Sequence, residues 1–185
     1  MRLFISIEVP EAVKKELAVV QGRLRGAGVD ASWTRAEGMH LTLKFLGEVS
    51  EQQVPGIMSN LRKAAEGTGP LGFSVSGVGT FPNPIKARVV WIGLGGDIEK
   101  LTRLQVAVEK AMVLLGTARE ERKFTPHLTL GRIKFIRSRD RWTKTLAEVK
   151  DISLTGFEAT SVSLIKSELK PSGAVYTDMG RVELK

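Results

Sequence analysis

The tetrapeptide His-Leu-Thr-Leu occurs twice in the chain, at residues 40–43 and again 87 positions later at residues 127–130. The sequence holds only two histidines, and each opens one of these tetrapeptides. Side chains alternate between the faces of a β-strand, so each motif places its histidine and threonine on one face and its two leucines on the other. We therefore expect two strands that bury their leucines in a core and turn their polar pairs toward a shared pocket.

Hydrophobic periodicity and turn residues predict the other elements of the fold. The expected strands cover residues 2–9, 32–34, 39–46, 71–78, 87–94, 124–133, 160–169 and 174–184, and the expected helices cover 10–25, 50–67 and 97–116. Residues 137–149 read as a charged connection that becomes helical near its end. This order of strands, helices and hairpin turns favours an α+β fold with antiparallel sheets over a doubly wound parallel one. We expect residues 1–185 to form a single domain of two lobes.

The formal net charge of +8 is unevenly distributed along the chain. Between Arg119 and Lys144, nine basic residues stand against three acidic ones, and this window contains the second motif. A basic surface around a polar pocket suits a polyanionic substrate such as a nucleic acid. The alternative is a basic protein whose charged faces are merely solvated.

Several classes of protein are disfavoured by composition. The chain has no cysteine, which excludes disulfides, thiol nucleophiles and cysteine-based metal sites, and two histidines alone make a poor zinc site. No apolar run approaches the roughly 20 residues of a membrane-spanning helix. The first eight residues contain an acidic side chain and precede no small-residue cleavage site, which argues against a signal peptide. We expect a cytoplasmic protein that needs no metal or cofactor.

Two histidines facing one pocket can serve as acid and base in a single step, because the unperturbed pKa of histidine lies near neutral pH. The threonine hydroxyls, Thr42 and Thr129, can donate to phosphate oxygens. Lys44 shares the strand parity of His40 and is expected to add a cation to the pocket. Arg132 has the opposite parity to His127, so it reaches the pocket only if the strand bulges at Gly131.

At these motifs the chain resembles the two-histidine (2H) phosphoesterases, and among them the RNA 2′,3′-cyclic phosphodiesterases, also called 2′-5′ RNA ligases or LigT-like proteins. The resemblance spans nearly the whole chain. Its segments are residues 2–7, Trp33, 39–47, 77–82, 89–91, 124–132 and 167–169, with Gly173 and Tyr176.

The resemblance implies a bilobal α+β fold with two pseudo-symmetric lobes around a central cleft, and helices on the outer faces. It further implies metal-independent hydrolysis of an RNA 2′,3′-cyclic phosphate to a 2′-phosphate, and a related reverse reaction that ligates RNA. By this resemblance His40 is the proton donor to O3′, His127 is the proton acceptor that activates water, and Thr42 and Thr129 bind the phosphate. Arg132 is a further phosphate contact. The expected partner of this monomer is an RNA with a cyclic phosphate end, such as a tRNA half.

Two other functions fit the same residues. One is a binding module that holds RNA ends or a nucleotide without turnover, with the basic window as its anchor. The other is a 2H phosphodiesterase acting on a small cyclic nucleotide or on an ADP-ribose cyclic phosphate. Among the aromatic residues, Phe45 and Trp91 are expected in the core, whereas Phe124 and Tyr176 are better candidates for stacking on a base.

Overall fold

The computed structural model describes residues 1–171 and 173–185; Ser172, in the turn expected between the last two strands, lies outside these ranges. Its first sheet has the order β3-β1-β8-β9. The members of this sheet are β1 (Arg2–Glu8), β3 (His40–Glu48), β8 (Ser161–Lys170) and β9 (Gly173–Glu183). The second sheet has the order β2-β6-β5-β4-β7. Its members are β2 (Val29–Trp33), β4 (Leu71–Phe81), β5 (Val89–Gly96), β6 (His127–Ile136) and β7 (Ser153–Ala159). The paired strands in both sheets run antiparallel.

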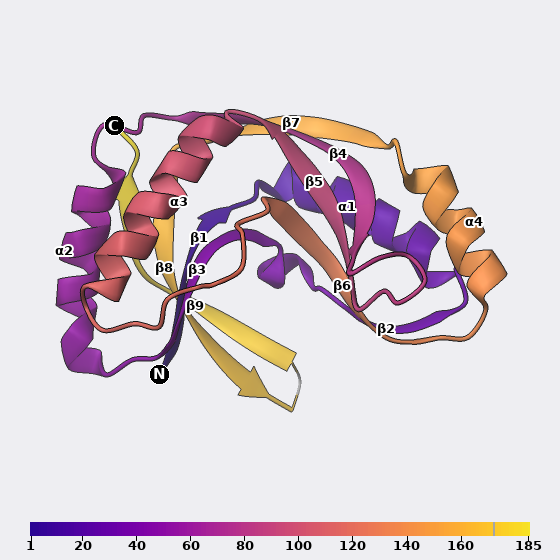
Figure 1. The fold of residues 1–185 in the computed structure, drawn as a ribbon, viewed down its shortest axis with the longest axis horizontal. Coiled ribbons are helices and arrows are strands. Elements are labelled where there is room, and N and C mark those ends of the chain that lie inside the picture. Colours follow the sequence, from indigo (N-terminus) through magenta and orange to yellow (C-terminus); the bar gives the residue numbers. More distant parts are fainter. Residues whose placement is uncertain (172) are drawn as a thin grey trace.

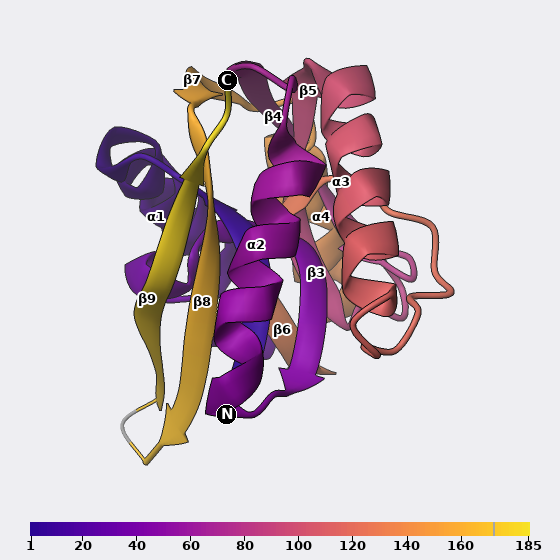
Figure 2. The same ribbon diagram turned by 90° about the vertical axis from the view of Figure 1, so that its left-hand side faces the viewer.

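Helices cover both sheets and give the molecule two lobes (Figure 1). They are α1 (Glu11–Arg25), α2 (Val54–Ala65), α3 (Ile98–Val113) and α4 (Arg139–Val149), with short 3-10 turns η1 (Ala36–Gly38) and η2 (Glu51–Gln53). Figure 2 shows α2 in front of the first sheet with α3 beside it; α2 contacts β9 and α3 contacts β3. Helix α1 contacts three strands of the second sheet, and α4 contacts β4. The expected α+β fold is confirmed. No helix within the described ranges is both long and apolar enough to cross a membrane.

Two elements differ from the sequence prediction. Helix α4 occupies most of the segment expected as a charged connection, because Trp142, Leu146 and Val149 form a buried stripe at helical spacing. Strand β7 is absent from the predicted elements. It is an edge strand whose polar and glycine residues are largely exposed, so it lacks the alternation that marks a half-buried strand.

Strand β1 lies at the centre of the first sheet, between β3 and β8. Leu3, Ile5 and Ile7 are fully buried on one face, and Phe4 and Ser6 are each only 2% exposed on the other. A strand covered on both faces fixes the sheet register, because a slip of one residue would exchange its buried faces. The first motif strand is paired to this rigid element.

Strand β3 contains a β-bulge at the fourth residue of its motif. In the pairing with β1, Thr42 lies opposite Ser6 and Lys44 lies opposite Ile5, so Leu43 is the additional residue. The bulge interrupts the alternation of the strand, and Leu43 and Lys44 are both 4% exposed. Phe45, the next residue, is 63% exposed.

Strand β6 repeats this irregularity at the same position of the second motif. Thr129 lies opposite Trp91 and Gly131 lies opposite Val90, which leaves Leu130 as the additional residue. Leu130 and Gly131 are both buried, and Arg132 is exposed. The bulge that the sequence required for Arg132 to reach the pocket is therefore present.

A buried glutamine from a helix supports each bulge. The amide of Gln105 in α3 donates to the carbonyl oxygen of Leu43 at 3.4 Å, and the amide of Gln21 in α1 donates to that of Leu130 at 2.7 Å. Gln21 also donates to Thr34 O at 2.7 Å. A buried carbonyl without a donor costs about 1–3 kcal/mol, so these amides stabilise the irregular backbone. Helix α3 is nearer the second motif in sequence but supports the bulge of the first motif. Helix α1 precedes the first motif in sequence but supports the bulge of the second.

The expected place of Lys44 in the pocket is wrong, because the bulge turns its side chain into the interior. Its ammonium donates to the Glu109 carboxylate and to Ala118 O, both at 2.8 Å. The other oxygen of Glu109 accepts a hydrogen bond from Glu120 N at 3.0 Å. Lys44 thus links β3 and α3 to the connection that leads into the second motif.

Replacing Lys44 with methionine is expected to destabilise the fold by about 3–5 kcal/mol, because Glu109 would be left as a largely buried, unpaired charge. The double variant Lys44→Met/Glu109→Leu is expected to recover much of this loss. Urea denaturation measures both effects, with Lys110→Met on the exposed face of α3 as the control, expected within about 0.5 kcal/mol of the parent protein. An equally stable Lys44→Met variant would contradict the assigned role.

Candidate active site

The two motif strands meet between the lobes, where β3 contacts β6 (Figure 1). The leucines of both motifs are at most 4% exposed, as the alternation predicted. His40, Thr42, His127 and Thr129 are half-buried on the opposite, polar faces of their strands. Each lobe thereby contributes one imidazole and one hydroxyl to the region between them.

His40 is enclosed by aromatic rings of its own lobe. Its imidazole stacks on Phe4 with ring centroids 4.6 Å apart, and Tyr176 of β9 meets it edge-on at 5.5 Å. Burial lowers the pKa of His40 to about 4, and the positive charge of Lys14 contributes to the same shift. The His40 ring is therefore neutral at pH 7 in the free protein.

His127 has a different environment. Its Nδ1 lies 2.6 Å from the carbonyl oxygen of Thr125, which can only accept, so Nδ1 carries the proton and Nε2 of the neutral ring is free to accept one. Phe81 meets the ring edge-on at 5.2 Å, and Trp91 lies 6.2 Å away. The backbone contact thus fixes both the tautomer and the orientation of His127.

Arg132 is exposed on β6, three residues after Thr129. Burial raises the pKa of the Tyr176 hydroxyl, and the positive charge of Arg132 partly opposes that shift. Tyr176 also packs against His40, so the charge of Arg132 acts on a residue that borders the first histidine. The five predicted site residues thus lie on β3 and β6, two strands that contact each other.

Several aromatic residues differ from their predicted positions. The sequence predicts Phe45 in the core, but it is 63% exposed and 5.9 Å from Phe4. Trp91 is likewise expected in the core, yet its half-buried ring lies across Gly79 and beside His127 and Phe81. Phe124 is half-buried against the core.

Phe4, which stacks on His40, borders the candidate site but is not among the residues predicted from the sequence. It shares strand parity with Arg2, Ser6 and Glu8, the polar residues of β1, and this parity places it on the face that bears the site. The alternation of β1 is thus a sufficient signal to find Phe4.

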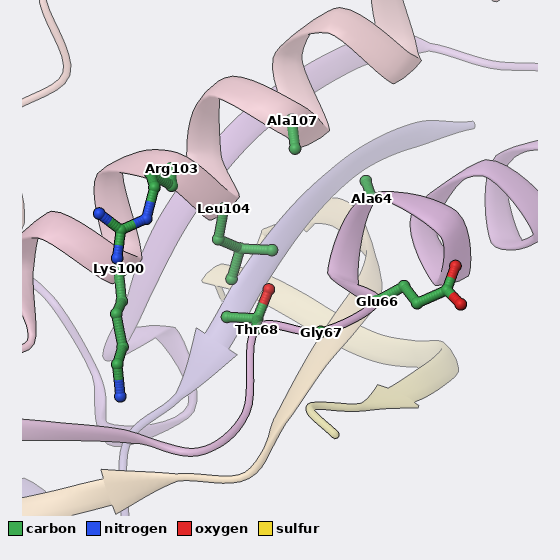
Figure 3. A pocket seen from close by; sticks show the side chains of 8 residues that line it. All are labelled: Ala64, Glu66, Gly67, Thr68, Lys100, Arg103, Leu104 and Ala107. Carbon is green, nitrogen blue, oxygen red and sulfur yellow. The ribbon is translucent and has the colours of Figure 1, made fainter.

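The pocket in Figure 3 lies elsewhere, between the end of α2 and the first turns of α3. It has a volume of about 320 Å³, and none of its lining residues belongs to a motif strand. Within residues 1–171 and 173–185, no three His, Cys, Asp or Glu side chains are grouped closely enough to hold a metal ion. Both histidines of the sequence lie in the paired motifs and not in this pocket.

Comparison with known proteins identifies the family of the chain. The chain is 35% identical over 179 residues to an RNA 2′,3′-cyclic phosphodiesterase of Methanothermobacter thermautotrophicus, an alignment that covers 97% of this chain and 96% of that protein. A protein of the same name from Methanocaldococcus jannaschii is 35% identical over 176 residues, with 95% and 96% covered. The crystal structure of TT0787 from Thermus thermophilus superposes with a TM-score of 0.83 at 28% identity, covering 100% of this chain and 98% of that one.

The sequence also matches the family described as LigT like phosphoesterase, over residues 7–91 and 94–176. These two segments include both His-Leu-Thr-Leu motifs, together with Phe81 and Trp91 beside the second histidine. Together with the relatives of about 35% identity, this match establishes that the chain belongs to the LigT-like phosphoesterases of the 2H superfamily.

Proposed function

We propose that this phosphoesterase hydrolyses the 2′,3′-cyclic phosphodiester end of RNA to a 2′-phosphomonoester, with its two histidines as acid and base. The observation that carries the proposal is that two His-x-Thr faces from different lobes meet, with their histidines in unlike environments. The names of the relatives point to the same substrate. The net charge of +8 suits a polyanion.

His127 is the base in this proposal. Its Nδ1 proton is committed to Thr125 O, so Nε2 can take a proton from water as the water oxygen attacks phosphorus. The aromatic rings of Phe81 and Trp91 restrict the imidazole from the sides. A fixed imidazole with one free nitrogen is what activation of water requires.

His40 is the acid that protonates O3′ as the P–O3′ bond breaks. Because its ring is neutral in the free protein, it must take up a proton when substrate binds. The cyclic phosphate is an anion, and an opposite charge within about 4–6 Å favours the charged form of a histidine. The negative charge of the bound substrate therefore favours protonation of His40. The proton is then present when the leaving O3′ is there to receive it.

Thr42 and Thr129 share the strand faces of the two histidines, so their hydroxyls are suited to donate to the non-bridging phosphate oxygens. Arg132 adds a positive charge on the same side of β6 and can oppose the charge that develops at phosphorus. This arrangement assigns proton transfer to the imidazoles and charge stabilisation to the hydroxyls and the guanidinium.

The proposal extends to several finer points. Reversal of the same chemistry would join a cyclic phosphate end to a 5′-hydroxyl through a 2′-5′ linkage, and tRNA halves are the kind of RNA that carries such ends. We also propose a cytoplasmic monomer in which residues 1–185 form one domain.

Non-catalytic binding of RNA ends is the competing function, and the absence of turnover in the following assay would favour it.

His40→Ala and His127→Ala are each expected to reduce turnover of a short RNA with a 2′,3′-cyclic phosphate end by roughly 10²- to 10⁴-fold, the usual contribution of a positioned acid or base. The assay is run with EDTA, and the product is expected to be a 2′-phosphate. Near-normal rates in either folded variant, or loss of parent activity that a divalent metal restores, would count against the mechanism.

A substrate that needs no acid separates the two histidines. In a 3′-deoxynucleoside 2′-(p-nitrophenyl phosphate), nitrophenolate leaves without a proton and no neighbouring hydroxyl can attack. His40→Ala is expected to retain most of its activity on this ester, whereas His127→Ala is not. The opposite pattern would exchange the two roles.

The pKa of the His40 imidazole is expected to be about 4 in an NMR titration and to rise by about two to three units, toward neutral pH, when a nucleoside 2′-phosphate binds. The lowered pKa also means that the unfolded chain binds the proton first. The free energy of unfolding should therefore fall as the pH decreases from about 6.5 to 4, and His40→Gln should lack this component. A midpoint unchanged by saturating product would contradict contact between His40 and phosphate.

A further inference from the structure

A second hollow, of about 460 Å³, lies at the end of β6 farthest from His127. Its walls are the connection between β4 and β5, the last four residues of β6 and the first residue of α4, and we refer to it as the β6 groove. Four of its lining residues are basic and none is acidic. The basic residues are Lys86, Arg88, Lys134 and Arg139.

The β6 groove also contains exposed apolar side chains among these charges. Phe135 is 64% exposed and Ile85 is 60% exposed. Proteins bind single-stranded nucleic acid by combining basic groups along the backbone with aromatic rings on which bases stack. The chemistry of the groove therefore matches a single-stranded polyanion with flat bases.

The walls of the groove are held in place before any ligand binds. The indole of the buried Trp142 donates to Pro84 O at 3.0 Å, and the side chain of Asn83 accepts from Ile85 N and Lys86 N at 3.1 and 2.9 Å. Arg88 N donates to Phe81 O at 2.7 Å. These bonds fix a connection that presents Ile85 and Lys86 to solvent.

The groove begins next to residues of the candidate active site in the chain. Pro82, one of its lining residues, directly follows Phe81, whose ring meets His127 at 5.2 Å. Along β6, the lining begins at Ile133, the residue after Arg132. This point is six residues beyond His127, or roughly 20 Å along a strand.

We propose that the β6 groove binds the single-stranded RNA that precedes the cyclic phosphate, with phosphates against Lys86 and Lys134 and a base stacked on Phe135. This inference rests on the proposed function and adds a substrate class to it. A mononucleoside cyclic phosphate can reach only the histidine site, whereas a longer RNA can occupy both. The protein should therefore favour oligonucleotide ends over mononucleotides.

The test compares hydrolysis of a mononucleoside 2′,3′-cyclic phosphate with that of an RNA of about eight nucleotides bearing the same end. Phe135→Ala is expected to raise KM for the RNA roughly 5- to 100-fold, the range given by loss of one stacked base. Lys86→Glu/Lys134→Glu should raise it as well and lower the salt dependence of RNA binding by about 0.7 per lost phosphate contact. Rates on the mononucleoside should stay within about twofold of the parent protein, a free-energy change of about 0.4 kcal/mol.

The matched control is Lys100→Glu/Arg103→Glu at the other pocket (Figure 3). Both double variants change two exposed basic residues to glutamate, so each lowers the net charge from +8 to +4. The control should retain the parent KM for the RNA. Equal losses in the two double variants would overturn the proposal, because net charge rather than the groove would then be responsible.

The other outcomes separate the groove from the proposed function. Groove variants with the parent KM for the RNA would refute RNA binding in the β6 groove, and so would variants that lose activity equally on both substrates. Either result would leave the proposed hydrolysis intact. If the parent protein hydrolyses neither substrate, the proposed function is refuted. Binding of the same RNA, measured by fluorescence anisotropy, then tests whether the β6 groove holds RNA. Weaker binding by the groove variants than by the control would support it, and equal binding would refute it.

Discussion

The geometry of the site depends on one additional residue in each motif strand. In a regular strand, Lys44 would share the face of His40, and Arg132 would point away from His127. The bulges at Leu43 and Leu130 reverse both orientations. They bury Lys44 in an ion pair with Glu109 and bring Arg132 back to the polar face. The bulge in β3 thus removes the Lys44 ammonium from the polar face of the first motif, and the bulge in β6 adds the Arg132 guanidinium to the polar face of the second.

The support for these bulges also joins the two halves of the chain. Gln21 of α1 binds the carbonyl at the second bulge, and Gln105 of α3 binds the carbonyl at the first. Each motif strand therefore depends on a helix associated in sequence with the other motif. Each histidine strand is therefore tied by a hydrogen bond to the part of the chain that lies nearer the other motif.

Much of this structure could be predicted from the sequence. The two motif strands, the three longest helical segments and the α+β class follow from periodicity, and the leucine and polar faces of both motifs are as alternation predicts. At the second motif the sequence offers a bulge at Gly131 as the condition for Arg132 to reach the pocket, and the structure has the bulge at Leu130. The first motif gives no such indication, because residues 40–45 alternate as a regular strand would. The errors at Lys44 and Phe45 both follow from that hidden bulge. Trp91 reads as core because its neighbours are apolar, and only the tertiary fold brings its ring beside His127.

The histidines themselves illustrate what sequence cannot supply. Identical tetrapeptides place them, yet Phe4 and Tyr176 enclose one ring and lower its pKa, whereas the Thr125 carbonyl fixes the tautomer of the other. The two roles proposed for them in catalysis arise from these unlike surroundings. The basic window likewise becomes specific only in the fold, which brings Lys134 and Arg139 together with Lys86 from a distant connection.

A crystal structure with a bound nucleoside 2′-phosphate tests the central claim most directly, namely that both motifs act on one phosphate. We predict that the phosphate lies between the two imidazoles, with its oxygens within about 3.2 Å of the Thr42 and Thr129 hydroxyls. Arg132 should lie on the same side of the phosphate. A phosphate that contacts only one motif, or that binds between α2 and α3 in the pocket of Figure 3, would contradict the account.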